Sequence, residues 1–126
     1  MKREIFLSFS SNPSSFGETV HNAAYKVQNL NFFYKAVKVS EIRKAIEAVR
    51  LLQIKGCSIS MPFKEKVVKF IDRKSPEVIA TGASNTILNR NNVLYGYNTD
   101  VYGARKSLEK IQLNNSDKVL LLGAGG

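Results

Sequence analysis

The chain has 126 residues, of which 44% are hydrophobic and 23% charged, so a single domain with a substantial core is expected. No apolar run approaches the roughly 20 residues that cross a bilayer, and the lone Cys57 excludes an internal disulfide, so we expect a cytoplasmic protein without membrane contacts. The net charge is +9, but basic residues never run longer than a pair, which disfavours nucleic-acid binding and suits steering of an anionic small molecule.

Strand and helix patterns alternate along the first half of the chain. Residues 4–9 predict a strand, and residues 18–29 carry apolar side chains at helical spacing. Residues 31–39 are rich in aromatic and β-branched side chains, so a second strand is expected there. Ser40 is the expected N-cap of the next helix, whose apolar side chains share one face. Those side chains are Ile42, Ala45, Ile46, Val49 and Leu52.

The middle of the chain predicts shorter elements. Residues 56–60 are expected to form a third strand. Pro62 suits the first turn of a helix that continues to about Asp72, because proline has no N–H to leave unpaired there. Ser75 and Pro76 open another short helix in the same way.

A hairpin and a longer helix follow. Residues 85–89 and 93–97 have strand patterns on either side of the turn sequence RNN, which predicts an antiparallel pair. Thr99 or Asp100 is the expected cap of a helix that ends near Ile111.

The last segment completes the predicted fold class. Residues 119–122 have the pattern of a buried strand, and the glycines after it are the kind of turn that opens a dinucleotide-binding unit. Repeated strand–helix–strand units indicate an α/β fold. We expect a three-layer α/β/α open sheet that is mostly parallel, with the hairpin contributing one antiparallel strand.

Four polar clusters lie at the ends of predicted strands, where open α/β sheets bind ligands. They are SSNPSSFGETVHN after the first strand, SMPFK after the third, ASNT before the hairpin and GYNTD after it. Each alone also fits a solvated surface lysine or a helix cap. His21 is the only histidine, so no histidine-based metal site is expected, and we predict no metal ligands.

Taken together and in this order, the clusters resemble the N-terminal substrate-binding domain of the shikimate dehydrogenase family. The resemblance covers nearly the whole chain and rests on His21-Asn22, GCSISMPFK, GASNT and GYNTD. The terminal GAGG resembles the opening of that family's NADP-binding domain. The resemblance therefore implies a substrate-binding domain over residues 1–115 and the start of a truncated Rossmann domain over residues 116–126. Its cofactor contacts would be Gly123, Gly125 and Gly126.

Some positions depart from the family pattern and resemble the shikimate dehydrogenase-like subgroup instead. Typical members hold the substrate carboxylate with two serines; Ser15 matches the first, but Gly17 replaces the second and Glu18 replaces a proline. Typical members read Asn-Val-Thr where this chain has Ser-Ile-Ser, ending at Ser60. Losing one charge-assisted hydrogen bond costs about 1.5–3 kcal/mol, which implies weaker shikimate binding unless Ser14 or a backbone N–H substitutes.

The resemblance assigns Lys64 and Asp100 as the catalytic pair and Ser15, Ser60 and Asn85 as further substrate-binding residues. The chemistry is consistent with those side chains, because oxidation of a secondary alcohol requires loss of its hydroxyl proton. A lysine beside a carboxylate can bond that hydroxyl and relay the proton. The implied activity is the NADP-dependent interconversion of shikimate, or a close analogue, and 3-dehydroshikimate.

Two other classes of function remain open from the sequence alone. One is a ligand-binding or regulatory module that has the fold without turnover, and the other is a basic nucleic-acid-binding domain. By the resemblance, family members also cover this domain with a C-terminal helix. The sequence therefore predicts an exposed apolar patch, with homo-oligomerisation through it, a disordered C-terminal segment, or both.

Overall fold

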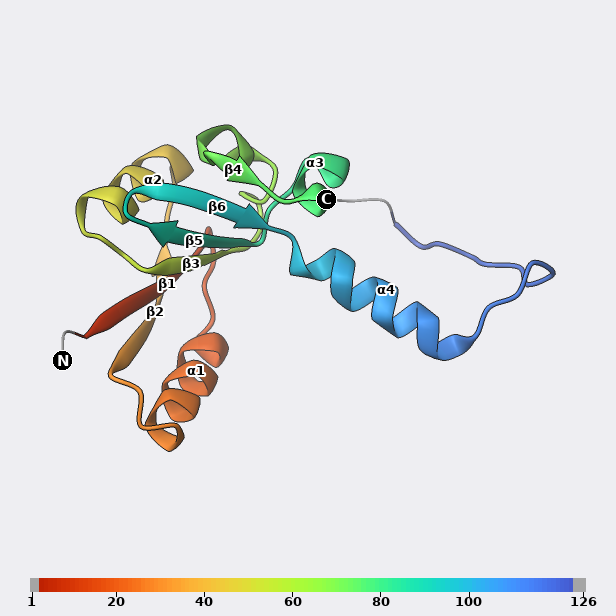
Figure 1. The fold of residues 1–126 in the computed structure, drawn as a ribbon, viewed down its shortest axis with the longest axis horizontal. Helices are drawn as coiled ribbons and strands as arrows, with labels where there is room; N and C mark the ends of the chain where they lie inside the picture. The colour runs from red at the N-terminus through yellow and green to blue at the C-terminus, as the bar shows by residue number, and fades with distance from the viewer. Residues whose placement is uncertain (1–2, 124–126) are drawn as a thin grey trace.

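The structure, a computed structural model, describes residues 3–123 and contains one six-stranded sheet with helices beside it (Figure 1). No helix within those residues is long and apolar enough to span a membrane. The strands are β1 (Glu4–Ser10), β2 (Phe32–Lys38), β3 (Gly56–Ile59), β4 (Arg73–Lys74), β5 (Thr86–Arg90) and β6 (Val93–Tyr97). The helices are α1 (Phe16–Val27), α2 (Ile42–Leu51), the 3₁₀ helix η1 (Lys66–Phe70), α3 (Pro76–Thr81) and α4 (Thr99–Ile111).

The strand order is β2-β1-β3-β5-β6-β4. β1 pairs in parallel with β2 and β3, and β4 pairs in parallel with β6, whereas β5 runs antiparallel to both of its neighbours. Phe9 packs in the core cluster with α2, while Phe6 contacts Tyr25 of α1 on the opposite face. The prediction of an α/β sheet with helices on both faces and one antiparallel strand is therefore confirmed.

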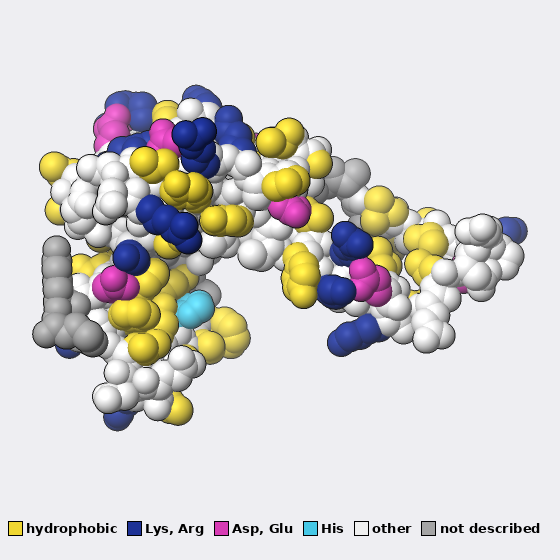
Figure 2. Space-filling view, viewed as in Figure 1, with side chains coloured by type: hydrophobic (Ala, Val, Ile, Leu, Met, Phe, Trp, Pro, Cys, Tyr) yellow, Lys and Arg dark blue, Asp and Glu magenta, His cyan; other side chains and the backbone are white. Residues whose placement is uncertain are grey.

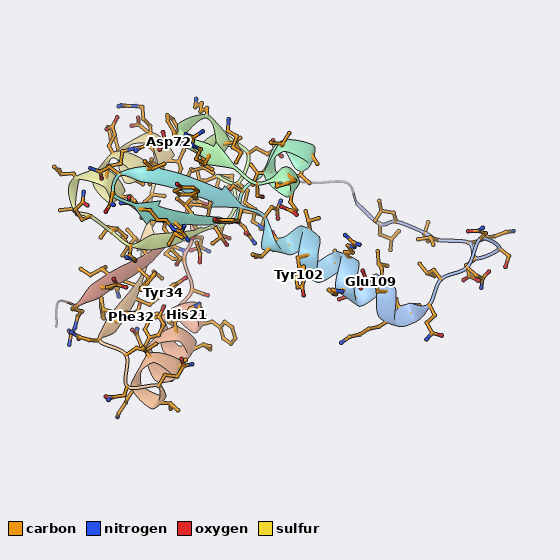
Figure 3. The ribbon with its side chains drawn as sticks, viewed as in Figure 1. His21, Phe32, Tyr34, Asp72, Tyr102 and Glu109 are labelled. Carbon is orange, nitrogen blue, oxygen red and sulfur yellow. The ribbon has the colours of Figure 1, made fainter. Side chains whose placement is uncertain are left out.

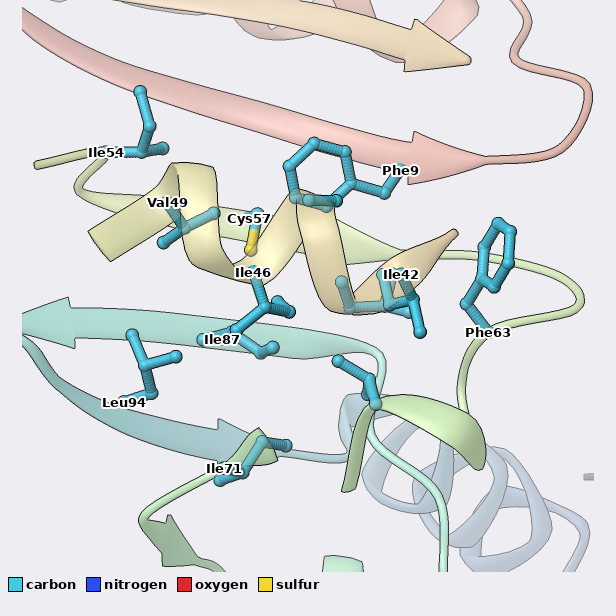
Figure 4. Packing of buried hydrophobic residues seen from close by; sticks show 13 residues of the cluster. Phe9, Ile42, Ile46, Val49, Ile54, Cys57, Phe63, Ile71, Ile87 and Leu94 are labelled. Carbon is cyan, nitrogen blue, oxygen red and sulfur yellow. The ribbon is translucent and has the colours of Figure 1, made fainter. Parts of the chain in front are cut away.

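The largest apolar cluster lies between α2 and the sheet (Figure 4). Four of the five side chains predicted to face the sheet are buried there, and Val49 is fully enclosed. Burying a side chain of this size contributes about 1.5–3 kcal/mol, so this face holds α2 in place. Leu52, the fifth, lies beyond the end of the helix and is 64% exposed. Glu41 rather than Ser40 occupies the N-cap position, and its side chain makes no capping bond.

The helix expected from Pro62 to Asp72 is replaced by the short η1. Val68 N–H donates to Glu65 O and Ile71 N–H donates to Val68 O, a three-residue spacing that tightens the turn. Asp72 N–H then pairs with Leu94 O, which draws the chain into β4 beside β6. This long-range pairing requires extended backbone by residue 71, so the helix cannot continue.

The hairpin and the short helix before it agree with the sequence prediction. Asn91 and Asn92 have φ of 51° and 66°, left-handed values that asparagine tolerates and that tight hairpin turns require. Ser75 caps α3 by accepting a hydrogen bond from the N–H of Val78. Gly82 ends that helix with a left-handed φ of 67°.

α4 extends away from the sheet, and none of its residues is buried (Figure 1). Its N-cap is Asn98, one residue before the predicted caps Thr99 and Asp100. Residues 119–122, predicted to form a strand, form none and are exposed. A single strand requires a neighbour to satisfy its backbone, and the described residues provide none here.

Candidate functional site

The predicted polar clusters meet at one edge of the sheet. Ser60 N–H donates to Phe9 O at 2.9 Å, which joins the ends of β3 and β1. Ile59 N–H donates to Asn85 O at 2.8 Å, which places the start of β5 beside the end of β3. The carboxyl ends of parallel strands thus converge here, as expected for a ligand site in an open α/β sheet.

Lys64 and Asp100 form an ion pair across this edge. Lys64 Nζ lies 2.7 Å from Asp100 Oδ2, although the two residues are 36 positions apart in the chain. Their side chains are 25% and 57% exposed. A partly exposed ion pair of this kind contributes only about 0–1 kcal/mol to stability, so it adds little to the stability of the fold. A ligand at the surface can reach both groups.

Backbone and amide contacts hold the positions of Lys64 and Asp100. Ser84 N–H donates to Lys64 O at 2.9 Å. Asn98 is buried; its Oδ1 accepts from Asp100 N–H, and its Nδ2 donates to Thr81 Oγ1 and Ala83 O. Asn98 therefore fixes the start of α4 against the end of α3 and thereby positions Asp100.

Asn85 is largely occupied by contacts within the protein. Its Oδ1 accepts from Thr99 N–H at 3.0 Å and from Thr86 Oγ1 at 2.9 Å. Its Nδ2 donates to Thr99 Oγ1 at 2.8 Å. One amide hydrogen is left over for a ligand, so Asn85 can hold the residue before Asp100 and donate one hydrogen bond outward.

Ser15 and Ser60 are exposed, and within the described residues their hydroxyls make no hydrogen bond. Ser15 occupies the N-cap of α1 without capping it by its side chain. A helix N-terminus carries partial positive charge, so a free hydroxyl there favours an anionic group. Both serines are available for the substrate contacts expected of them.

A groove of about 300 Å³ lies on the α1 face of the sheet. Its floor is mostly apolar, and Figure 2 shows hydrophobic side chains gathered around the single histidine on this side of the molecule. The sequence did not predict which polar residues line this groove, although the alternation of side chains along each strand indicates which of its strand residues face α1. The polar and aromatic residues lining it are Phe6, His21, Tyr25, Tyr34, Ser58, Thr86 and Tyr97. A smaller hollow of about 230 Å³ lies beside Lys64 and Met61.

Helix α1 is attached to the outer edge of β2 by two side chains. Asn22 exchanges hydrogen bonds with Tyr34, its Nδ2 donating to the carbonyl and its Oδ1 accepting from the N–H, both at 2.9 Å. Glu18 accepts from Lys35 Nζ and from Ala36 N–H. The hydrogen bond from Lys35, with that from Ala36, holds the pKa of the Glu18 carboxyl below its usual range.

The described residues provide no centre for metal or thiol chemistry. Among them, no three His, Cys, Asp or Glu side chains gather closely enough to hold a metal ion. Burial raises the pKa of the Cys57 thiol to about 12, so this cysteine stays protonated at neutral pH and packs as a small apolar side chain.

Comparison with known proteins decides the family. The family model of the shikimate dehydrogenase substrate binding domain matches residues 13–87, more than half of the chain. The chain belongs to this family. A shikimate dehydrogenase-like protein of Haemophilus influenzae is 45% identical over 123 residues, which cover 98% of this chain and 45% of that protein. The NADP(+) shikimate dehydrogenase of Pyrococcus abyssi is 41% identical over 112 residues, covering 89% and 42%.

Solved structures of family members have the same fold. A shikimate 5-dehydrogenase-like protein matches with a TM-score of 0.83 and 45% identity, covering 88% of this chain and 41% of that one. The Listeria monocytogenes shikimate 5-dehydrogenase, solved with shikimate and NAD, matches with a TM-score of 0.78 and 29% identity, covering 89% and 40%. The chain thus spans less than half the length of these relatives.

Proposed function

We propose that this domain binds the substrate of an NADP-dependent oxidoreductase that interconverts shikimate, or a close analogue, and 3-dehydroshikimate. The observation that carries the proposal is the 2.7 Å contact of Lys64 Nζ with Asp100 Oδ2. The pair lies at the strand edge that also presents the unpaired hydroxyls of Ser15 and Ser60. The names of the relatives support this assignment, because several are NADP(+) shikimate dehydrogenases.

In this proposal Lys64 and Asp100 handle the hydroxyl proton of the substrate. During oxidation the O–H bond breaks and Lys64, in its amine form, takes the proton; during reduction its ammonium returns a proton to the forming hydroxyl. Asp100 orients Lys64 and compensates its positive charge, and it accepts a hydrogen bond from a second ring hydroxyl. Ser15, Ser60 and the remaining amide hydrogen of Asn85 hold the rest of the ring.

NADP, when bound, accepts or supplies the hydride. The part of its site that this chain would provide is the glycine-rich end. Gly123 has φ of 95°, and apart from its chain neighbours no atom of residues 3–123 lies within 4 Å of where its Cβ would be, so this backbone can accept close approach by a phosphate. Gly125 and Gly126 lie outside the described residues. We assign residues 1–115 to the substrate-binding domain and residues 116–126 to the start of an NADP-binding domain.

The activity is tested by Lys64→Ala in the protein that carries this domain with its NADP-binding domain. We expect loss of NADP-dependent shikimate oxidation by at least about a hundredfold, the lower end for removing a general acid–base group. The exposed ion pair contributes little to folding, so the melting temperature should stay nearly unchanged.

The matched control is Lys69→Ala, which removes an exposed lysine of η1 outside the edge that carries the pair. This variant should keep wild-type turnover. Wild-type rates in Lys64→Ala would remove Lys64 from the mechanism. Shikimate binding without NADP-dependent turnover by the unmodified protein would instead support the alternative of a non-catalytic ligand-binding module.

A further inference from the structure

Thr99 lies between two residues whose roles the structure explains. Asn98 caps α4 with its side chain, and Asp100 pairs with Lys64. Thr99 is the first residue of α4 and is exposed, so neither capping nor packing accounts for its side chain. Its hydroxyl nevertheless accepts a hydrogen bond of 2.8 Å from Asn85 Nδ2, 14 residues earlier in the chain. The contact joins Thr99 to a candidate substrate-binding residue.

Thr99 and Thr86 together hold the Asn85 amide in one orientation. A backbone N–H can only donate, so the atom that faces Thr99 N–H at 3.0 Å is the amide oxygen. The same oxygen accepts from Thr86 Oγ1 at 2.9 Å, which uses its second lone pair. The amide nitrogen donates one hydrogen to Thr99 Oγ1, and its other hydrogen has no partner within the described residues. Asn85 therefore offers a ligand a donor and not an acceptor.

The backbone that carries this amide is fixed as well. Asn85 O accepts from the N–H of Ile59, at the end of β3, at 2.8 Å. Asn85 N–H donates to the carbonyl of Tyr97, at the end of β6, at 3.1 Å. Rotation of the side chain is the freedom left to the amide, and the two contacts with Thr99 restrict it. A donor that is ordered before the ligand arrives loses less conformational entropy on binding.

We propose that Thr99 is a positioning residue, which orients the Asn85 amide so that its free hydrogen is donated to an oxygen of the substrate ring. This inference rests on the proposed function. Thr99 acts through Asn85 and touches no reacting atom. Without the threonine hydroxyl the amide is held through its oxygen alone, so its nitrogen swings more freely and the ligand has to order it. The cost of that ordering appears as weaker binding.

The contact lies in the first turn of α4, and the rest of the helix provides a control. Beyond this turn α4 leaves the sheet, and the side chains of Tyr102 and Glu109 lie away from the strands (Figure 3). Ser107 carries a hydroxyl in this outer part, where it donates to Gly103 O within the helix. Ser107→Ala therefore removes a hydroxyl from the same helix without altering the contacts of Asn85.

The test measures shikimate binding by isothermal titration calorimetry in the protein that carries this domain with its NADP-binding domain. Thr99→Val keeps the shape of the side chain but removes the hydroxyl, so shikimate should bind about three- to tenfold more weakly. The turnover number at saturating shikimate should change by less than about twofold, because the lost contact serves ground state and transition state alike. Thr99→Ser keeps the hydroxyl, so this variant and Ser107→Ala should bind shikimate as the wild type does.

A double-mutant cycle separates this role from a general effect on the fold. If Thr99 acts through Asn85, Thr99→Val causes no further loss of affinity once Asn85→Ala has removed the amide. Additive losses in the double variant, or wild-type affinity in Thr99→Val, would overturn the role of Thr99. Equal losses in Thr99→Ser and Thr99→Val would also overturn it, because the hydroxyl would then not be the group that matters. Absence of shikimate binding by the unmodified protein would overturn the proposed substrate instead.

Discussion

Gly96 lies where two parts of the site pack together without room for a side chain. A Cβ there would lie 2.6 Å from Ile71 Cδ1 and 3.2 Å from Ser84 Oγ. Ser84 is fully buried, donates its backbone N–H to Lys64 O and donates its hydroxyl to Tyr97 O. The absence of a side chain at position 96 therefore keeps Ser84 in contact with the loop that carries Lys64.

Gly96→Ala should destabilise the fold by about 1–3 kcal/mol, because the added methyl overpacks a site with no free volume. Gly103→Ala is the matched control. Gly103 lies inside α4, and beyond its own helix backbone and chain neighbours no atom of the described residues lies within 4 Å of its Cβ position, so alanine should stabilise that helix by up to about 1 kcal/mol. Urea denaturation measures both changes. Equal effects of the two substitutions on the free energy of unfolding would show that the close approach of Ile71 to Gly96 does not prevent a side chain at position 96.

At the residue scale, the sequence identified the pair that the structure brings together but not the residue that positions it. Lys64 and Asp100 were predicted because the motifs that contain them, taken in order, resemble those of the shikimate dehydrogenase family. The run Asn-Thr-Asp offers three plausible helix caps, and Thr99 or Asp100 was predicted. The deciding contacts of Asn98 are to Thr81 and Ala83, 17 and 15 residues away, which local patterns do not contain.

At the scale of elements, α1 closes the open edge of β2. Edge strands carry unpaired N–H and C=O groups that invite pairing with another chain. Asn22 satisfies both groups of Tyr34, and Glu18 accepts from the next free N–H, that of Ala36. In the His-Asn motif, Asn22 thus has a structural role, and His21 stacks against Tyr34.

This attachment predicts a pH-dependent contribution of Glu18 to stability. Its hydrogen bonds with Lys35 and Ala36 N–H put the folded-state pKa below the usual 4.5. The charged form therefore stabilises the fold above about pH 4.5, and this contribution is lost as the pH falls through the folded-state pKa. Glu18→Gln should be less stable than wild type at pH 7, and the difference should shrink towards pH 3.

Thermal denaturation at a series of pH values measures this difference. The control is Glu65→Gln, because within the described residues the carboxylate of Glu65 takes part in no ion pair. That variant should follow the wild-type stability curve at every pH. A stability difference for Glu18→Gln that is the same at pH 7 and pH 3 would contradict the role of the charge.

The elements differ in how far the sequence could predict them. Helix α2 was predicted because its apolar face repeats at helical spacing and its core contacts require that spacing. The two-residue β4 and the 3₁₀ helix η1 were not predicted, because each depends on the pairing of residues 72–75 with β6, more than 20 positions away. Short elements created by tertiary pairing leave little local signal.

At the scale of the whole molecule, exposed apolar surface is concentrated in two places, the segment 119–122 and the groove on the α1 face of the sheet. Residues 119–122 are 69–86% exposed although all four are Val or Leu. The groove on the α1 face, a hollow of about 300 Å³ with a mostly apolar lining, adds a second apolar surface. Contiguous apolar surface of this kind is uncommon on soluble monomers and favours association.

We therefore expect this chain to self-associate in a concentration-dependent manner. Sedimentation velocity should give a weight-average sedimentation coefficient that rises with protein concentration. Replacing Leu120 and Leu122 together by Ser removes two of the most exposed apolar side chains and should reduce that rise. Asn115→Ser, an exposed polar change in the same segment, should leave it as in the wild type. A concentration-independent monomer would contradict the expectation, because these side chains would then be tolerated in water without a partner.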